Sequence, residues 1–93
     1  MLKIIGNDIR RGTAKIGWIE DNDIRDHTNK KIGYFSANDI YKANGVKIGF
    51  IEGNNLYIAN GPTLRVDDVR ERHVVGGSIP DLARAAAMIL FGD

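Results

Sequence analysis

The sequence predicts a mainly β fold: an antiparallel array of about four β-hairpin repeats of about 16 residues around a shared core, plus one C-terminal α-helix. Segments that begin at Lys15, Lys31 and Lys47 repeat with a period of 16 residues. Each copy starts with residues that alternate between the two faces of a strand, and Asn-Gly pairs between apolar runs favour hairpin turns. A unit of this length fits two strands and two turns. An alanine-rich C-terminal segment predicts the helix.

The repeat begins before its first full copy. Ile4 to Arg10 fit the same pattern and form a truncated copy, and three full copies follow. After Pro62 the pattern continues only in Thr63 to Val66, where we expect Leu64 and Val66 to occupy the isoleucine and aromatic positions. The columns of the full copies are Lys15/Lys31/Lys47, Ile16/Ile32/Ile48, Gly17/Gly33/Gly49, Trp18/Tyr34/Phe50 and Ile19/Phe35/Ile51.

The aromatic column allows two interpretations. Trp18, Tyr34 and Phe50 alternate with glycine, and we expect them to share a face with the isoleucine column and pack in the common core. The glycines would then admit a neighbouring ring or strand. The alternative is a ligand site, because aromatic rings on a β surface stack sugars or bases. The candidate ligand-binding residues are Trp18, Tyr34, Tyr41 and Tyr57.

The C-terminal segment predicts a helix after a charged run, Asp67 to His73, which we interpret as part of a strand and a variable stretch. Ser78 is the expected N-cap, with Asp81 three residues later in an arrangement like a capping box. The segment Leu82 to Phe91 has high helix propensity, and Gly92 ends it.

The chain divides into a β-hairpin repeat domain, residues 1–77, and a C-terminal helix, residues 78–93. The helix is apolar on more than one side, so it packs either on the same domain or on a partner subunit. We expect homo-oligomerisation or a protein partner, because a small β core gains stability from association. The candidate interaction residues are Leu82, Met88, Ile89 and Phe91.

Composition excludes several classes of protein. The 93 residues carry a net charge of +1, which is far from the basic balance typical of nucleic-acid binding, so we expect no such partner. No cysteine is available for a disulfide or a thiolate zinc site. The longest apolar run, Ala85 to Phe91, is too short to cross a bilayer. Charged residues at Asp8 to Arg11 interrupt any signal-peptide core, so we expect a cytoplasmic protein without a membrane partner.

Few residues suggest catalytic or metal chemistry. The turn from Glu20 to Asp23 offers oxygens for calcium, but it lacks the calcium-binding loop of an EF-hand, and turn formation explains its residues. His27 and His73 are candidate general bases for a small hydrolase, but they form no recognisable motif. The lysine column offers a basic rim for an anion, or it protects strand ends. We therefore expect no cofactor, no metal and no enzyme activity.

The repeated Lys-Ile-Gly-aromatic column, with Ile16 to Glu20 followed by Ile24 to His27, resembles the bacterial proteins called four-fold β-flowers. The resemblance covers about residues 3–66. It implies short hairpins that radiate about a pseudo-fourfold axis. It implies no catalytic residues, because that group has no assigned activity. Similar Gly-aromatic hairpins with Asn-Gly turns also occur in the tyrosine-aspartate repeats of bacterial toxin shells.

The functional hypothesis that follows is a non-catalytic interaction or scaffold module that self-associates. Its exposed hairpin tips, such as Asp21-Asn22-Asp23 and Asn38-Asp39, are candidate partner contacts. The alternative is a module that binds a sugar or a nucleotide through its aromatic residues. Buried rings favour the scaffold, and exposed rings that line a concavity favour the ligand site.

Overall fold

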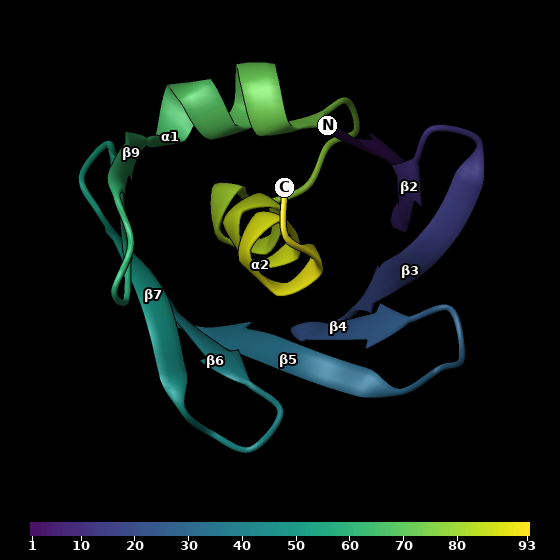
Figure 1. Cartoon of the computed structure of the whole chain (residues 1–93), viewed down its shortest axis with the longest axis horizontal. Helices are drawn as coiled ribbons and strands as arrows, with labels where there is room; N and C mark the ends of the chain where they lie inside the picture. The colour runs from purple at the N-terminus through teal and green to yellow at the C-terminus, as the bar shows by residue number, and fades with distance from the viewer.

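The computed structural model describes all 93 residues, and one sheet of ten strands curls around a single helix (Figure 1). The strands follow the sheet in chain order from β1 to β9, and β10 lies beside β1. A mainly β chain with one short C-terminal helix is therefore confirmed. The strands are β1 (Leu2–Ile5), β2 (Asp8–Arg11), β3 (Ala14–Glu20), β4 (Asp23–Asp26), β5 (Lys31–Ser36), β6 (Asp39–Lys42), β7 (Lys47–Glu52), β8 (Asn55–Ile58), β9 (Thr63–Arg65) and β10 (Val74–Val75).

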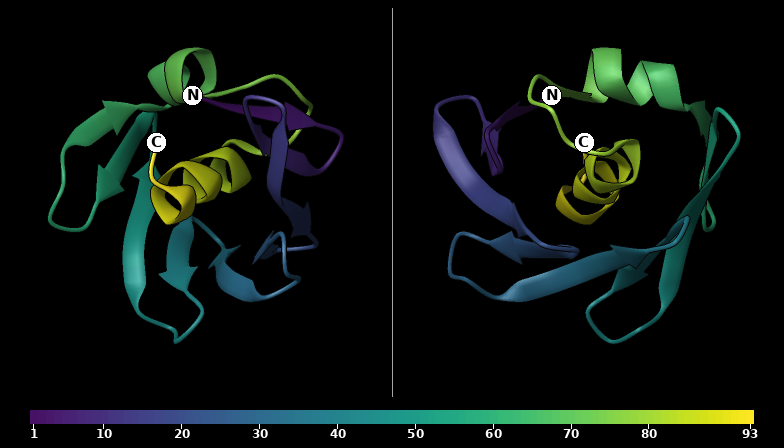
Figure 2. Two further views of the ribbon diagram at one scale, coloured as in Figure 1. Left: turned by 45° about the vertical axis from the view of Figure 1, so that its right-hand side comes forward. Right: turned by 180° about the vertical axis from the view of Figure 1, so that it is seen from behind.

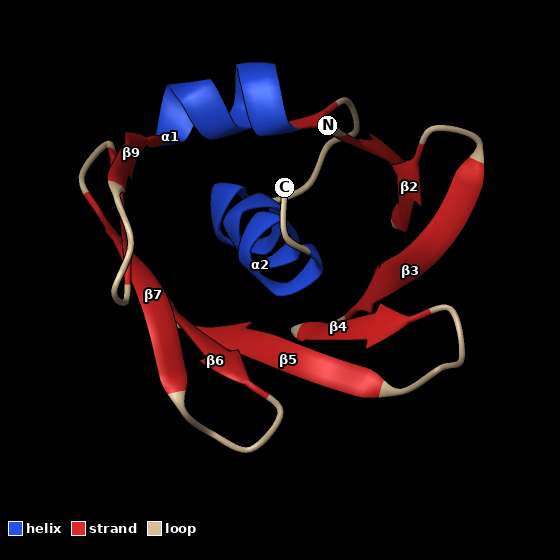
Figure 3. Ribbon diagram, viewed as in Figure 1, coloured by secondary structure: helices blue, strands red, loops and turns tan.

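Helical turns close the gap between the two ends of the sheet (Figure 3). The charged run after β9 forms α1 (Val66–Asp68) and a π-helical turn, η1 (Val69–His73), where the sequence suggested a strand. This connection carries the chain to β10, which pairs with β1 in parallel rather than antiparallel fashion. Its buried residues, Val66 and Val69, explain why a charged segment packs here. The prediction of antiparallel pairing throughout is wrong at this edge of the sheet. Parallel strands need a long crossover connection, and the segment of α1 and η1 supplies it before β10.

Two-residue turns at the hairpin tips have one backbone conformation in common. Their first residues, Gly6, Asp21, Ala37 and Gly53, all have a positive φ, between 53° and 61°. The asparagine that follows each of them has no positive φ, which matches a type II′ turn. The carbonyl oxygens of these asparagines accept hydrogen bonds of 2.8–3.0 Å from the N–H groups of Ile19, Phe35, Ile51 and Val66. Three tips are thereby tied to the strand that follows their own hairpin, and the fourth is tied to Val66, the first residue after β9.

The glycine column, not the aromatic column, faces the interior. Gly17 and Ile19 are buried whereas Trp18 between them is half-buried, and the same pattern recurs in β5. Ile24, Ile40 and Leu56 on the partner strands are completely buried. The expectation that the aromatic column belongs to the core is therefore wrong.

A β-bulge in each long strand explains the error. Ile9 pairs with Gly17 but Arg10 pairs with Lys15, so Ile16 is an extra residue, and Ile32 and Ile48 are its equivalents. A bulge interrupts simple alternation, so the isoleucine and the aromatic residue two positions later need not share a face. The bulged isoleucines are half-buried and pack at the margin of the core.

The C-terminal helix α2 (Asp81–Phe91) lies in the centre of the ring (Figures 1 and 2). It fits there because glycines of the sheet face its large C-terminal side chains and because its buried middle is rich in alanine. A Cβ atom at Gly17 would lie 2.6 Å from Phe91 Cζ, and one at Gly49 would lie 3.1 Å from Ile89 Cδ1. Gly33 faces Leu90 in the same way. On the helix, Ala83, Ala85, Ala86 and Ala87 are at most 1% exposed. A helix enclosed on all sides needs no single apolar stripe.

The helix begins at Asp81 and not after an N-cap at Ser78. Pro80 precedes the first turn, and its carbonyl oxygen accepts the Arg84 N–H at 3.1 Å. The end is as predicted, because Gly92 has a left-handed φ of 73° and donates to the Met88 carbonyl oxygen. No helix of the molecule combines the length and the apolar character needed to cross a membrane.

Arg84 is the one buried charged residue, and it joins α2 to the segment before it. Its guanidinium donates hydrogen bonds to the carbonyl oxygens of Val74 (2.8 Å), Gly76 (2.7 Å) and Gly77 (3.4 Å). Burial lowers the pKa of Arg84 below its ordinary value, but arginine stays charged in proteins. Its hydrogen bonds satisfy carbonyl groups in a loop that has little regular structure.

The last partial copy differs in register from the expected one. Leu64 lies opposite Leu56, in the position that Gly49 has opposite Ile40. Val66 takes the backbone hydrogen-bond position of Ile51. The sequence alignment places Leu64 and Val66 one column too early because β9 has no bulge and so lacks one residue.

Candidate functional site on the outer face

The outer face of the sheet carries the aromatic residues that the core does not use. Tyr34 stacks on Tyr41 across the strands, and Phe50 stacks on Tyr57, each pair with ring centroids 4.9 Å apart and an interplanar angle of 18°. Both pairs are directly opposite in register, which brings such side chains into contact. Trp18 has Arg25 as its cross-strand neighbour. We call Trp18, Tyr34, Tyr41, Phe50 and Tyr57 the outer aromatic face.

A lysine from the repeated column covers one ring in each copy. The Nζ atoms of Lys15, Lys31 and Lys47 lie 5.1, 4.4 and 4.6 Å from the ring centroids of Trp18, Tyr34 and Phe50. These distances are within the range of cation–π interactions. In a regular strand, a lysine and a ring three residues apart would lie on opposite faces of the sheet. The bulge between them brings both side chains to the same face.

The same lysines form ion pairs with the preceding hairpin. Lys15 lies 3.1 Å from Asp8, Lys31 3.3 Å from Asp23 and Lys47 3.0 Å from Asp39. Each positive charge on the outer aromatic face is therefore matched by a carboxylate, and the face is rich in polar groups without a strong net charge.

Asp39 also accepts a hydrogen bond of 3.3 Å from the Tyr41 hydroxyl. Desolvation raises the pKa of Tyr41, and the negative charge of Asp39 and this hydrogen bond raise it further. Tyr41 is thus a neutral hydrogen-bonding group near neutral pH, and it is not an activated nucleophile.

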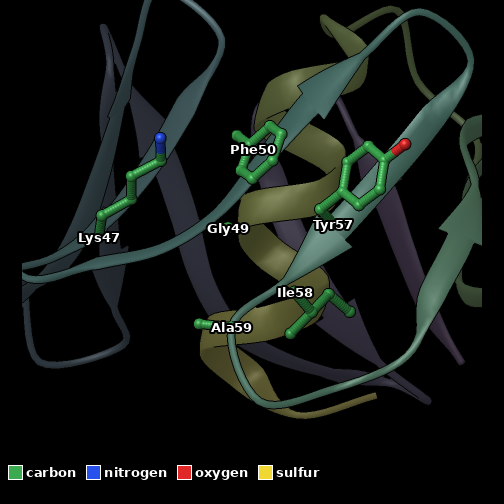
Figure 4. Close-up of a pocket in the computed structure, with 6 residues that line it drawn as sticks. All are labelled: Lys47, Gly49, Phe50, Tyr57, Ile58 and Ala59. Carbon is green, nitrogen blue, oxygen red and sulfur yellow. The ribbon is translucent and has the colours of Figure 1, made fainter.

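A hollow of about 350 Å³ adjoins the second stacked pair (Figure 4). Figure 4 shows the rings of Phe50 and Tyr57 side by side, on the side of the strands away from α2. The lining residues are Lys47, Gly49, Phe50, Tyr57, Ile58 and Ala59. The hollow therefore combines two aromatic rings with one ammonium group.

The outer aromatic face ends at the last interval between hairpins. Asn55 and Thr63 occupy the places of the aspartate and the lysine, and Arg65 occupies the place of the ring. Both members of the ion pair are lost together, which indicates that the lysine–aspartate contact links neighbouring copies.

The structure places the predicted site residues in two separate groups. Tyr34, Tyr41 and Tyr57 belong to the stacked pairs, and Trp18 lies on the same face without an aromatic partner. Sequence reasoning missed Phe50 as a member of the face, because it assigned that residue to the core. The apolar residues at the columns of Ile19 and Ile24 were the sequence signal that could have identified the buried face of the sheet.

The predicted interaction residues lie on α2 within the chain's own ring of strands. Met88 is 3% exposed, and Leu82, Ile89 and Phe91 are half-buried against the core. A contact of these residues with a second chain stays a prediction. In such a contact they would have to pack against the core of their own chain and against the second chain at the same time.

The histidines and the acidic turn do not converge on one site. His27 is exposed in the connection after β4, whereas His73 ends η1 and its Nδ1 atom lies 3.6 Å from a carboxylate oxygen of Asp93. No three His, Asp or Glu side chains gather in a way that could hold a metal ion.

Comparisons with known proteins add no relative. No protein-family model, no curated protein and no solved structure matches the chain.

Proposed function

We propose that this protein is a non-catalytic interaction module that self-associates through the outer aromatic face. The proposal includes a fold of four equivalent hairpins around a shared core, as in the four-fold β-flower proteins that the sequence resembles. The lysine–aspartate pairs and the tip hydrogen bonds, which recur between successive hairpins, support this equivalence.

The rings are not buried, and one pair lines a hollow, so the burial criterion drawn from the sequence favours the ligand site. The proposal of self-association is carried by a different observation: two stacked aromatic pairs lie together on the outer face of the sheet, outside the core. Aromatic residues are enriched in the centres of protein interfaces. The face also carries both signs of charge in pairs, so a second copy can approach it without net repulsion. The middle of α2, from Ala83 to Met88, is buried within the chain and is not available for association.

Sedimentation equilibrium of the wild type and of the double variant Tyr41→Ser/Tyr57→Ser tests the proposal. One ring of each stacked pair is removed, so we expect an oligomer for the wild type and a lower mass for the variant. Ile5→Ser is the matched control, because Ile5 is 51% exposed and lies outside the outer aromatic face. A monomeric wild type, or equal masses for wild type and double variant, would contradict the proposal.

A second candidate function is binding of a sugar or a nucleotide in the hollow beside Phe50 and Tyr57. The observation that favours it is the meeting of two rings and Lys47 at one concavity. Rings of this kind stack on the flat faces of sugars and bases. Titration with glucose and with adenosine monophosphate, followed by chemical shifts of Phe50 and Tyr57, tests this function. Phe50→Leu keeps the apolar volume and removes the stacking ring, so it should weaken any binding that depends on stacking.

A further inference from the structure

A positively charged groove runs along the end of the ring where the connections between successive hairpins lie. Two hollows of about 400 and 390 Å³ share Lys42 and Leu90 in their linings. Four lysines and no acidic residue line them, in a molecule with 13 basic and 12 acidic residues. We call this surface the lysine groove, and its lysines are Lys30, Lys31, Lys42 and Lys47.

Two of these lysines do not recur in the next copy of the repeat, and they form no ion pair. Lys31 and Lys47 belong to the repeated column and bind Asp23 and Asp39. Lys30 and Lys42 have no carboxylate within ion-pair distance, and the equivalent residues in the next copy are Val46 and Ile58. The equivalence of the hairpins therefore does not explain why Lys30 and Lys42 stand here.

The floor of the lysine groove is aliphatic. The half-buried residues Ile48, Ile58, Ile89 and Leu90 line the hollow of about 390 Å³, and no aromatic ring does. The floor is open because α2 ends here and the bulged isoleucines lie at the margin of the core. Val46 at the rim is 53% exposed, which is large for an apolar residue.

We propose that the lysine groove binds a single-chain anionic amphiphile, with its hydrocarbon chain on the aliphatic floor and its carboxylate at Lys30 and Lys42. An apolar floor excludes a purely polar anion as the best ligand, because such a ligand would leave the floor exposed to water. The unpaired ammonium groups favour a negative head group over a neutral or positive one. The groove shares Lys31 and Lys47 with the ring contacts and ion pairs of the outer aromatic face, and it shares Lys47, Ile58 and Ala59 with the hollow beside Phe50 and Tyr57. Lys30 and Lys42 take no part in those contacts, and neither proposal requires the other.

Titration with decanoate below its micelle concentration tests this site, with backbone amide shifts of Val46, Ile48 and Leu90 as the readout. We expect saturable shifts at these residues, and binding of decanoate roughly 4- to 16-fold tighter than that of octanoate, as two additional buried CH₂ groups require. Decyltrimethylammonium, which has the same chain and a positive head, should not compete. Acetate should not bind measurably.

Two variants locate the charge recognition. Lys30→Gln/Lys42→Gln should weaken decanoate binding roughly fivefold or more, whereas Lys3→Gln, which removes an exposed lysine outside the groove, should leave it unchanged. Val46→Asp places a carboxylate at the exposed rim and should abolish binding without loss of the folded spectrum. Equal binding of the positive amphiphile, equal affinity for acetate, or no effect of the paired lysine substitutions would overturn the proposal. So would binding only to vesicles of dioleoylphosphatidylglycerol, which would make a membrane surface the partner.

Discussion

At the scale of single residues, glycine has a packing role in the long strands that differs from its role in the turns. Gly6 and Gly53 have a positive φ and open space where a Cβ atom would be. Gly17, Gly33 and Gly49 have no such φ and face α2 at close range. Only the second group makes room for a neighbouring element, as glycine within strands often does.

Gly33→Ala should therefore destabilise the protein by about 1–3 kcal/mol, the usual cost of overpacking. Its new methyl group would collide with Leu90 Cδ1 and lie 2.6 Å from the Tyr41 carbonyl oxygen. Gly49→Ala is the matched comparison and should cost less, because its nearest atoms are 2.9 and 3.1 Å away. Denaturant unfolding measures both values. An increase in stability for Gly33→Ala, as expected for a glycine that faces solvent, would contradict this packing.

Asp26 is a second case in which one side chain organises its surroundings. It accepts hydrogen bonds from the Thr28 hydroxyl (2.5 Å), the Thr28 N–H (2.8 Å) and the Lys30 N–H (3.1 Å). The hydrogen bond from the Thr28 side chain is the main cause that lowers the pKa of Asp26 below its ordinary value of 3.8. The connection between β4 and β5 is thus held by a charged carboxylate.

The lowered pKa of Asp26 predicts a contribution to acid sensitivity. The folded state binds its proton at lower pH than the unfolded state does, so the contribution is present above pH 3.8 and is lost as the pH falls through the folded value. The free energy of unfolding should decrease less on acidification in Asp26→Asn than in the wild type. Thr28→Ala should give an intermediate dependence. If the free energy of unfolding of the wild type and of Asp26→Asn depends on pH in the same way below pH 4, the hydrogen bonds do not stabilise the charged form of Asp26 in solution.

At the scale of elements, α2 shows why an alanine-rich helix is needed in this fold. The helix contacts strands from several parts of the sheet and the η1 segment, so apolar residues surround most of it, and Arg84 is its one buried polar side chain. Between Arg84 and Met88 every residue is a buried alanine, and the large side chains of Ile89, Leu90 and Phe91 lie where the glycine column provides space. The helix and the glycines are therefore complementary parts of one packing arrangement.

Ala86→Leu tests the tight fit of the helix. Ala86 is completely buried, and three additional carbon atoms there should destabilise the protein by about 1–3 kcal/mol or more. Ala14→Leu, at an exposed position at the start of β3, is the control and should change the free energy of unfolding little. Thermal or denaturant unfolding of the two variants gives the comparison. Similar stabilities would show that the ring of strands has more room around α2 than the structure indicates.

At the scale of the whole molecule, the 16-residue period predicted a β-rich chain and the positions of its strands well. It did so because turn residues and apolar residues recur at fixed places, and each copy faces the same local requirements. The helix end at Gly92 was predictable for a similar local reason. The helix start was not, since no side-chain cap forms there and Arg84 contacts a loop outside the helix.

The faces of the sheet could not be predicted in the same way. A single extra residue, such as Ile16, changes the relation between neighbouring columns, and the sequence carries no clear mark of a bulge. Because of this one effect the aromatic column lies on the outer face and not in the expected core, and the glycine column makes room for α2 and not for a neighbouring ring or strand. Of the candidate site, the tyrosines were predicted, whereas the lysine–ring contacts and the role of Phe50 depended on the bulge.

The central feature of the molecule is the position of α2 inside its own chain, against the glycine column. Nuclear Overhauser effects test it directly, in a sample that mixes isotope-labelled and unlabelled protein so that contacts within and between chains are distinguished. We expect intrachain effects from the Gly17 Hα protons to the Phe91 ring, and from Gly33 and Gly49 to the methyl groups of Leu90 and Ile89. Absence of these effects, or their presence only between chains, would contradict the arrangement.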